Sequence, residues 1–211
     1  HSLTGSLRAY TMLGTANSAV YPKWGIGVEA GASGSIESKS YFSPMGYLYI
    51  YGYIPGIIGE QGMKLTMMTQ QKLKSDAVFG QTIVSIMPRG LSSNASLSNW
   101  LSIRNSSITK LTVDYAVPIF IGDVSIGGNM FSIKRLVITP HFDYTALADK
   151  GLWSAGGSIV LDMHSILTLE WPCSFGVTMS CNGGSARNSI MADSGINIDP
   201  FFVGPTFNVT F

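Results

Sequence analysis

The chain has 211 residues, only 12% of them charged, and its formal net charge at pH 7 is +1. So few basic residues argue against a nucleic-acid-binding or anionic-membrane surface. Its mean hydropathy of +0.26 is apolar for a soluble protein, yet no run approaches the ~18 uncharged apolar residues of a membrane helix. High hydropathy without a helical span is typical of alternating transmembrane strands, because their signal is spread over many short segments.

The first part of the chain contains four strand-like segments. The chain opens at His1 with neither an initiator Met nor an apolar targeting core, so we expect a processed product or a fragment. Apolar and polar or small residues then alternate with period two over residues 3–13 and 25–36, and residues 47–55 and 63–73 are two further strand candidates. In the third segment, four tyrosines between positions 47 and 53 share one face. This ladder is expected to line a lumen or to lie at the level of lipid headgroups, with a plain core strand as the alternative.

The longest segment without alternation covers residues 74–107. Leu97, Trp100 and Leu101 have helical spacing after Ser and Asn cap candidates, which predicts one short helix. A connection of this length inside an array of strands is usually functional or disordered. We therefore treat 74–107 as a long loop with a role of its own.

The second part of the chain alternates more regularly. Its predicted strands are residues 108–119, 131–147, 152–166, 167–181 and 201–211, with a loop at 182–198. In 167–181 every odd position is apolar, and every even position except Pro172 is small, polar or charged. Ordinary strands have ~5–6 residues, whereas a tilted strand crossing a bilayer needs about 9–11. The length of 167–181 therefore favours a membrane barrel over a sandwich.

Two cysteines lie on that strand. Cys173 and Cys181 are eight residues apart, hence about 26 Å apart on an extended strand, whereas a disulfide needs Cα atoms within ~7 Å. We predict that they do not pair with each other.

These patterns predict an all-β fold over residues 1–211, an antiparallel up-and-down transmembrane β-barrel of about nine strands. Single-chain bacterial barrels have even strand numbers, and open edges are not tolerated in hydrocarbon. Either the count is off by one, or the remaining strands lie on another chain. A soluble β-sandwich is the alternative, and extraction without detergent would select it.

Several motifs occur in a fixed order. Arg89 and Gly90 lie in the long loop, five predicted strands follow, Phe142 and Asp143 lie in the second of these, and Phe211 ends the chain. This order resembles the C-terminal half of the outer-membrane assembly and translocation barrels of Gram-negative bacteria, the BamA and TamA type. Their long loop carries an Arg-Gly-aromatic motif, and an Asp on a following strand lies near its Arg.

The resemblance implies a sixteen-stranded barrel of which this chain is the C-terminal part. Loop 74–107 would fold into the lumen, and Arg89 would meet Asp143 in a bidentate charged clamp. Phe211 would be the C-terminal signal of an outer-membrane protein. The stretch YGYIPGIIGEQGMKL is also similar to barrels fused to periplasmic TolB-like propeller domains. Leu91 and Thr145 stand where the family has an aromatic residue and a glycine.

Charged and imidazole side chains are expected to give the lumen a lining of mixed sign. These residues are Lys110, Asp114, Arg135, His141, Asp162, His164 and Glu170. His141 and Asp143 share one face of their strand, and Asp162 and His164 repeat the arrangement in mirror order on the next. Such facing pairs could bind a metal or perform acid-base chemistry, as in outer-membrane proteases. Because no convincing nucleophile accompanies them, we expect no catalytic residue, metal or cofactor.

The sequence therefore predicts a non-enzymatic outer-membrane protein of the assembly and translocation type. Its expected partners are the lipid bilayer and either other envelope subunits or the remaining barrel strands, and nucleic acid is not expected. One alternative is a barrel that anchors a periplasmic domain or conducts solutes as a porin. A second alternative is a barrel enzyme of the omptin or phospholipase kind.

Overall fold

The computed structural model describes residues 2–14, 19–35, 45–73, 86–92, 94–127, 131–148, 150–166 and 173–209. These residues form nine strands and three helices. The strands are β1 (Ser2–Met12), β2 (Gly25–Ser35), β3 (Met45–Pro55), β4 (Gly62–Lys72), β5 (Ser107–Ile126), β6 (Phe131–Leu147), β7 (Lys150–Ile166), β8 (Cys173–Gly183) and β9 (Phe201–Val209). The helices are the 3-10 turn η1 (Arg89–Leu91), α1 (Ala95–Arg104) and α2 (Ser185–Ser194).

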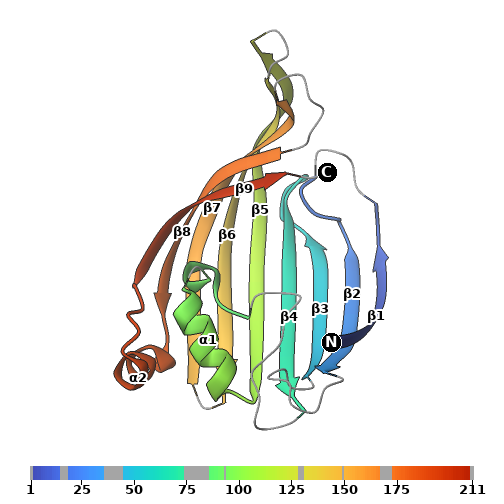
Figure 1. Ribbon diagram of the computed structural model, residues 1–211. Helices are drawn as coiled ribbons and strands as arrows, with labels where there is room; N and C mark the ends of the chain where they lie inside the picture. Colours follow the sequence, from blue (N-terminus) through green and yellow to red (C-terminus); the bar gives the residue numbers. More distant parts are fainter. Residues whose placement is uncertain are drawn as a thin grey trace.

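All nine strands belong to one antiparallel sheet in the order β1 to β9, so each strand pairs with its neighbours in sequence. This confirms the predicted up-and-down arrangement. The sheet curls around its helices (Figure 1) but is not closed into a barrel, because in the described part of the chain β1 and β9 are both edge strands. The predicted meander of antiparallel strands is therefore confirmed, whereas closure into a barrel is not observed. Nine antiparallel strands leave β1 and β9 pointing the same way, so the usual antiparallel closing pair cannot form between them.

The two faces of the sheet have opposite chemistry. On β8, Phe175, Val177 and Met179 are 42–50% exposed, whereas Ser180, next to Met179, is 1% exposed. A soluble sheet normally covers its apolar face and exposes its polar one. Here the convex side is apolar and exposed, while the concave side is covered and combines polar residues with a cluster of apolar ones.

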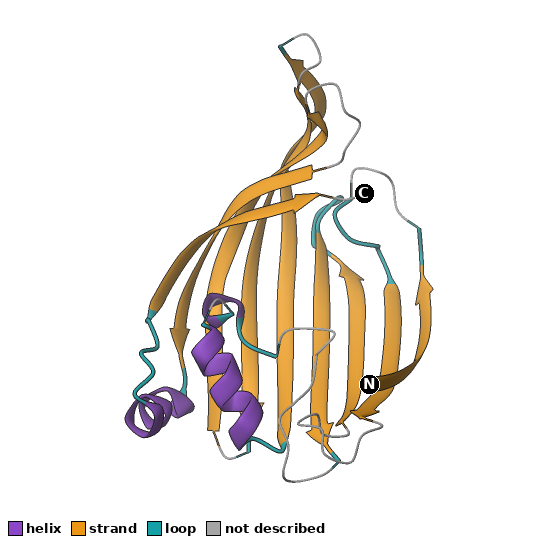
Figure 2. Ribbon diagram, in the orientation of Figure 1, coloured by secondary structure: helices purple, strands orange, loops and turns teal. Residues whose placement is uncertain are grey.

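The helices lie at one end of the concave side (Figure 2). The helix predicted around Leu97 is confirmed as α1, and it begins at Asn94, whose side chain accepts a hydrogen bond of 3.0 Å from the Leu97 amide. Helix α2 was not predicted, since its sequence SARNSIMADS has few apolar positions. No helix in the described ranges is long and apolar enough to span a membrane.

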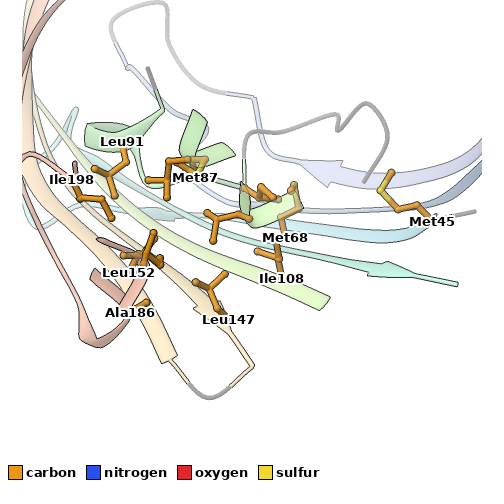
Figure 3. Close-up of a cluster of buried hydrophobic side chains, with 13 residues drawn as sticks. Met45, Met68, Met87, Leu91, Ile108, Leu147, Leu152, Ala186 and Ile198 are labelled. Carbon is orange, nitrogen blue, oxygen red and sulfur yellow. The ribbon is translucent and has the colours of Figure 1, made fainter. Parts of the chain in front are cut away.

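A hydrophobic cluster joins the helices to the wall. Its members are Met45, Met68, Ile86, Met87, Leu91, Leu97, Leu101, Ile108, Leu147, Leu152, Ala186, Ile190 and Ile198. Leu91 and Ile198 lie close together, and Leu152 lies near Ala186 (Figure 3). Burying one such side chain contributes about 1.5–3 kcal/mol. The cluster therefore fixes the loop that carries η1 and α1 against the concave side.

The tyrosine ladder lies on the concave face of β3. Tyr51 is 3% exposed, and a Cβ on Gly27 of the neighbouring strand would lie 2.2 Å from its ring. Glycine thus lets the ring cross β2, where the Tyr51 hydroxyl accepts a hydrogen bond of 3.0 Å from Arg8. Tyr47 crosses Gly31 in the same way and donates to Glu29 at 3.0 Å. The ladder lies on the concave side, a position that both a lumen lining and the alternative of a core strand require.

Two strands differ from their predicted ranges by more than two residues. The strand predicted at 108–119 continues to Ile126, because bulges near Pro118 and between Ile121 and Val124 shift the alternation. The strand predicted at 167–181 is observed as Cys173–Gly183, and residues 167–172 lie outside the described residues. Both cysteines on it are free, as predicted.

Candidate functional site

Arg89, at the start of η1, points at two carboxylates on the concave wall. Its Nε and Nη2 donate to the two oxygens of Asp143 at 3.1 and 2.8 Å, and its backbone amide donates to Asp143 Oδ2 at 2.8 Å. Its Nη2 also donates to Asp114 on β5 at 2.5 Å. The bidentate contact between Arg89 and Asp143 expected from the sequence is therefore present, with Asp114 as an additional acceptor.

The positive and negative charges around Arg89 balance each other. Lys110 Nζ lies 3.9 Å from Asp143 Oδ2, so two cations and two carboxylates share the site. Burial lowers the pKa of Arg89, but its hydrogen bond to Asp143 and the charges of Asp114 and Asp143 outweigh burial and raise that pKa above its ordinary value. Because the Asp143 side chain is fully buried, losing one partner would leave an uncompensated charge in a poorly solvated place.

We call residues 86–91 the latch segment, since successive strands bind its main chain. Thr145 Oγ1 donates to the Ile86 carbonyl at 2.7 Å, and Lys110 Nζ donates to the Met87 carbonyl at 2.6 Å. The contacts continue at Gly90, whose amide donates to Ser154 Oγ at 3.3 Å.

On β8, Asn182 Nδ2 donates to the Gly90 carbonyl at 3.2 Å. With Asp143 binding the Arg89 amide, side chains from β5, β6, β7 and β8 hold five main-chain groups of the latch segment. The wall thus recognises the path of the backbone as well as the arginine.

Gly90 lies where no side chain fits. A Cβ at this position would be 2.1 Å from Asn182 Oδ1 and 2.4 Å from Ser180 Oγ. Both neighbours are buried, so neither can move into solvent without breaking packing. The glycine after the arginine is required by this close approach to β8.

Other predicted residues lie elsewhere. Phe142, grouped with Asp143 as a wall partner, is 45% exposed on the convex face and takes no part in the latch, because neighbouring residues on a strand face opposite sides. Glu170 and Phe211 lie outside the described residues. Thr145 is the residue that binds the Ile86 carbonyl.

The predicted facing pairs of histidine and aspartate are wrong. In the observed register His141 faces Gly156, and Arg135 faces Asp162. His141 is buried beside the Arg89 cluster, whereas His164 is exposed. About six residues of strand separate Gly156 from Asp162, roughly 20 Å, so the two pairs form no common site. No group of three metal-binding side chains occurs among the described residues.

Three contributors to the site were missed by the sequence reasoning, namely Thr145, Ser154 and Asn182. They carry no charge and match no motif. The signal that could have found them is register: on adjacent strands, inward positions level with Asp143 must meet the latch segment.

Comparison with protein-family models, with curated proteins and with solved structures finds no match for this chain.

Proposed function

We propose that the protein is an outer-membrane β-barrel protein of the assembly and translocation type, acting within an envelope complex. The observation that carries this proposal is the inverted burial of the sheet. Residues such as Phe142 and Val177 are exposed on the convex side, while Asp143 and Ser180 are covered on the concave side. Lipid outside and polar groups inside would account for that arrangement.

The dimensions of the apolar side support a bilayer. Phe175 and Phe207 form one aromatic pair with ring centroids 4.7 Å apart, and Phe201 lies six residues from Phe207 on β9. At about 3.4 Å per residue the two levels are roughly 20 Å apart along the strand, which is about 15 Å of membrane depth at a strand tilt of about 40°. Both levels therefore fit within the apolar band of a membrane barrel, which is about 25 Å tall.

The parity of the sheet supports a larger barrel. Because β1 and β9 run in the same direction, antiparallel closure requires an odd number of additional strands. The seven strands that a sixteen-stranded barrel would still need satisfy this condition. We propose that further strands complete the wall, from either the same protein or a partner subunit.

The latch favours an assembly or anchoring role over an open porin. Arg89 and the main chain of the latch segment are held by four strands, so the loop occupies the interior and braces the wall. The order Arg89, Gly90 and then Asp143 supports the assembly type, whereas a filled interior by itself would also suit an anchor. Nothing in the register around His141 favours an enzyme.

Membrane extraction tests the proposal. We expect the protein to stay in the membrane fraction through urea and alkaline carbonate washes, and to dissolve only in detergent with the heat-modifiable gel mobility of a folded barrel. Release by urea alone, as a folded protein, would contradict membrane insertion and favour a sandwich.

A variant separates the assembly type from the anchor. Arg89→Ala should reduce the amount of other folded outer-membrane barrels in the cell, with Arg104→Ala on α1 as the matched control. An unchanged barrel content together with normal insertion of the Arg89→Ala protein would favour the anchor.

A further inference from the structure

A second segment lies against the concave side, apart from the latch. Residues 19–24, which we call the strap, precede β2 and form no helix or strand. They meet the wall far away in sequence, since Ala19 contacts Arg135 on β6, 116 residues further along the chain. The strap therefore extends along the concave side from β2, which it precedes, to β6.

Arg135 divides its donors between the wall and the strap. Its Nε donates to Asp162 on β7 at 2.5 Å, while its Nη1 donates to the Ala19 carbonyl at 2.9 Å. Asp162 is in turn fixed by Ser174 on β8 at 2.8 Å. The Arg135 side chain is only 15% exposed, so the wall orients the guanidinium before it binds the strap.

Tyr21 anchors the strap to β3 and β4, which lie between β2 and β6 in the sheet. Its ring lies 5.7 Å from that of Tyr53 on β3, and its Cβ lies 3.3 Å from where a Cβ would stand on Gly62 of β4. Burial, with the nearby charge of Asp114, raises the pKa of Tyr21 to about 12. The strap is thus attached at β6 through one main-chain carbonyl and at β3 and β4 through one ring.

We propose that the strap is a second closing segment of the interior, that Arg135 is its catch, and that a solute or chain can pass along the interior only after the bond between Arg135 and Ala19 breaks. Tyr21 feels the charges of both Arg89 and Asp114, so the strap lies next to the latch cluster. Two segments from different parts of the chain therefore fill the interior at neighbouring levels. The position of the strap follows from the fold alone, whereas its role in passage rests on the proposed barrel.

Thiol labelling tests the position of the strap. Ala19→Cys is placed in a protein carrying Cys173→Ser and Cys181→Ser, and isolated membranes in mild detergent are treated with a polar maleimide. Arg135→Gln removes the catch. Arg135→Lys keeps the charge beside Asp162, but a single ammonium cannot reproduce the fork that reaches both partners. Lys134→Gln, one residue away at the bulge of β6, is the matched control.

We expect labelling of the thiol introduced by Ala19→Cys to accelerate about tenfold or more in both Arg135 variants and to be unchanged by Lys134→Gln. In planar bilayers the Arg135→Lys protein should also conduct more than the parent. Equal labelling rates in all proteins would contradict the attachment of the strap by Arg135. Faster labelling without any rise in conductance would contradict the role of the strap in passage. Failure of the barrel itself would show differently, as a protein that does not insert into bilayers although its labelling can still be measured.

Discussion

Asp143 accepts three hydrogen bonds from Arg89, two from the guanidinium and one from the backbone amide. A single carboxylate thus fixes both the side chain and the main chain at the start of η1. Because the Asp143 side chain is fully buried, the latch depends on a charge that water cannot solvate once Arg89 leaves. The stability of the loop and of the wall are therefore coupled at this residue.

Replacing the Asp143 carboxylate should destabilise both the loop and the wall. Asp143→Asn keeps the shape but leaves two cations facing one carboxylate, and we expect a loss of about 3 kcal/mol in the free energy of unfolding. Urea unfolding in detergent measures it. Trypsin should also cleave after Arg89 faster than in the parent protein. Asp193→Asn, on the exposed side of α2, is the control, and equal midpoints for the two variants would contradict the coupling.

Gly90→Ala should push the latch segment off β8. The new methyl group would overlap Asn182 Oδ1 and Ser180 Oγ, so we expect a loss of about 1–3 kcal/mol, typical of overpacking. Gly5→Ala is the control, because nothing lies within 4 Å of its added Cβ.

A double-mutant cycle identifies the clash. In a background carrying Ser180→Ala and Asn182→Ala, the added methyl group has room, and Gly90→Ala should cost less than half as much. A cost that stays the same in both backgrounds would show that the strain lies in the backbone instead.

The fold was predictable where period-two alternation is strong. All nine strands were anticipated, and the tyrosine ladder of β3 was correctly assigned to a single face. The alternation says nothing about closure, since it does not define which strand, if any, pairs with the outer edge of β1. It also failed to predict the last residues of β5, because bulges after Pro118 change which residues point to each face of the sheet.

The site was only half predictable. The contact between Arg89 and Asp143 could be predicted because the order of these two charged residues in the chain resembles a known motif. The main-chain contacts of Ser154 and Asn182 depend on register between strands, which a single sequence does not define. Because the register was unknown, His141 was also wrongly expected to face Asp162.

Gly27→Ala tests the ring that crosses β2. A methyl group there would overlap Tyr51, whose hydroxyl binds Arg8, so the hydrogen bond to β1 should break at a cost of about 1–3 kcal/mol. Gly46→Ala is the matched control, because its nearest neighbour would be 4.0 Å away. Thermal unfolding in detergent compares them. If both variants melt alike, the ring does not depend on the glycine.

Tyr21 should make the protein sensitive to alkali. Its pKa is raised to about 12 from an ordinary 10, so the folded state favours the neutral phenol. The resulting stability is fully present below about pH 10 and is lost as the pH rises toward 12. The unfolding midpoint should therefore fall more steeply between about pH 9.5 and 11.5 in the parent than in Tyr21→Phe. Parallel curves for the two proteins would exclude Tyr21 as the cause.

The convex face offers the sharpest test of a bilayer. Val177 is 43% exposed between the two aromatic levels, and Cys181 is exposed opposite Phe201 at one of them. In water, replacing either surface residue with Arg should change the unfolding free energy by only ~0.5 kcal/mol. In a membrane, Arg costs about 2–4 kcal/mol near the midplane and about 0–1 near the interface.

We therefore expect Val177→Arg to cost about 2 kcal/mol or more beyond the cost of Cys181→Arg when unfolding is measured in lipid vesicles. The comparison removes the intrinsic effect of arginine in a strand, because both positions lie on the same face of β8. A depth-dependent cost has no explanation in a soluble sheet, since water solvates both positions alike. Equal, small costs at the two positions would mean that the apolar face is covered by protein and not by lipid.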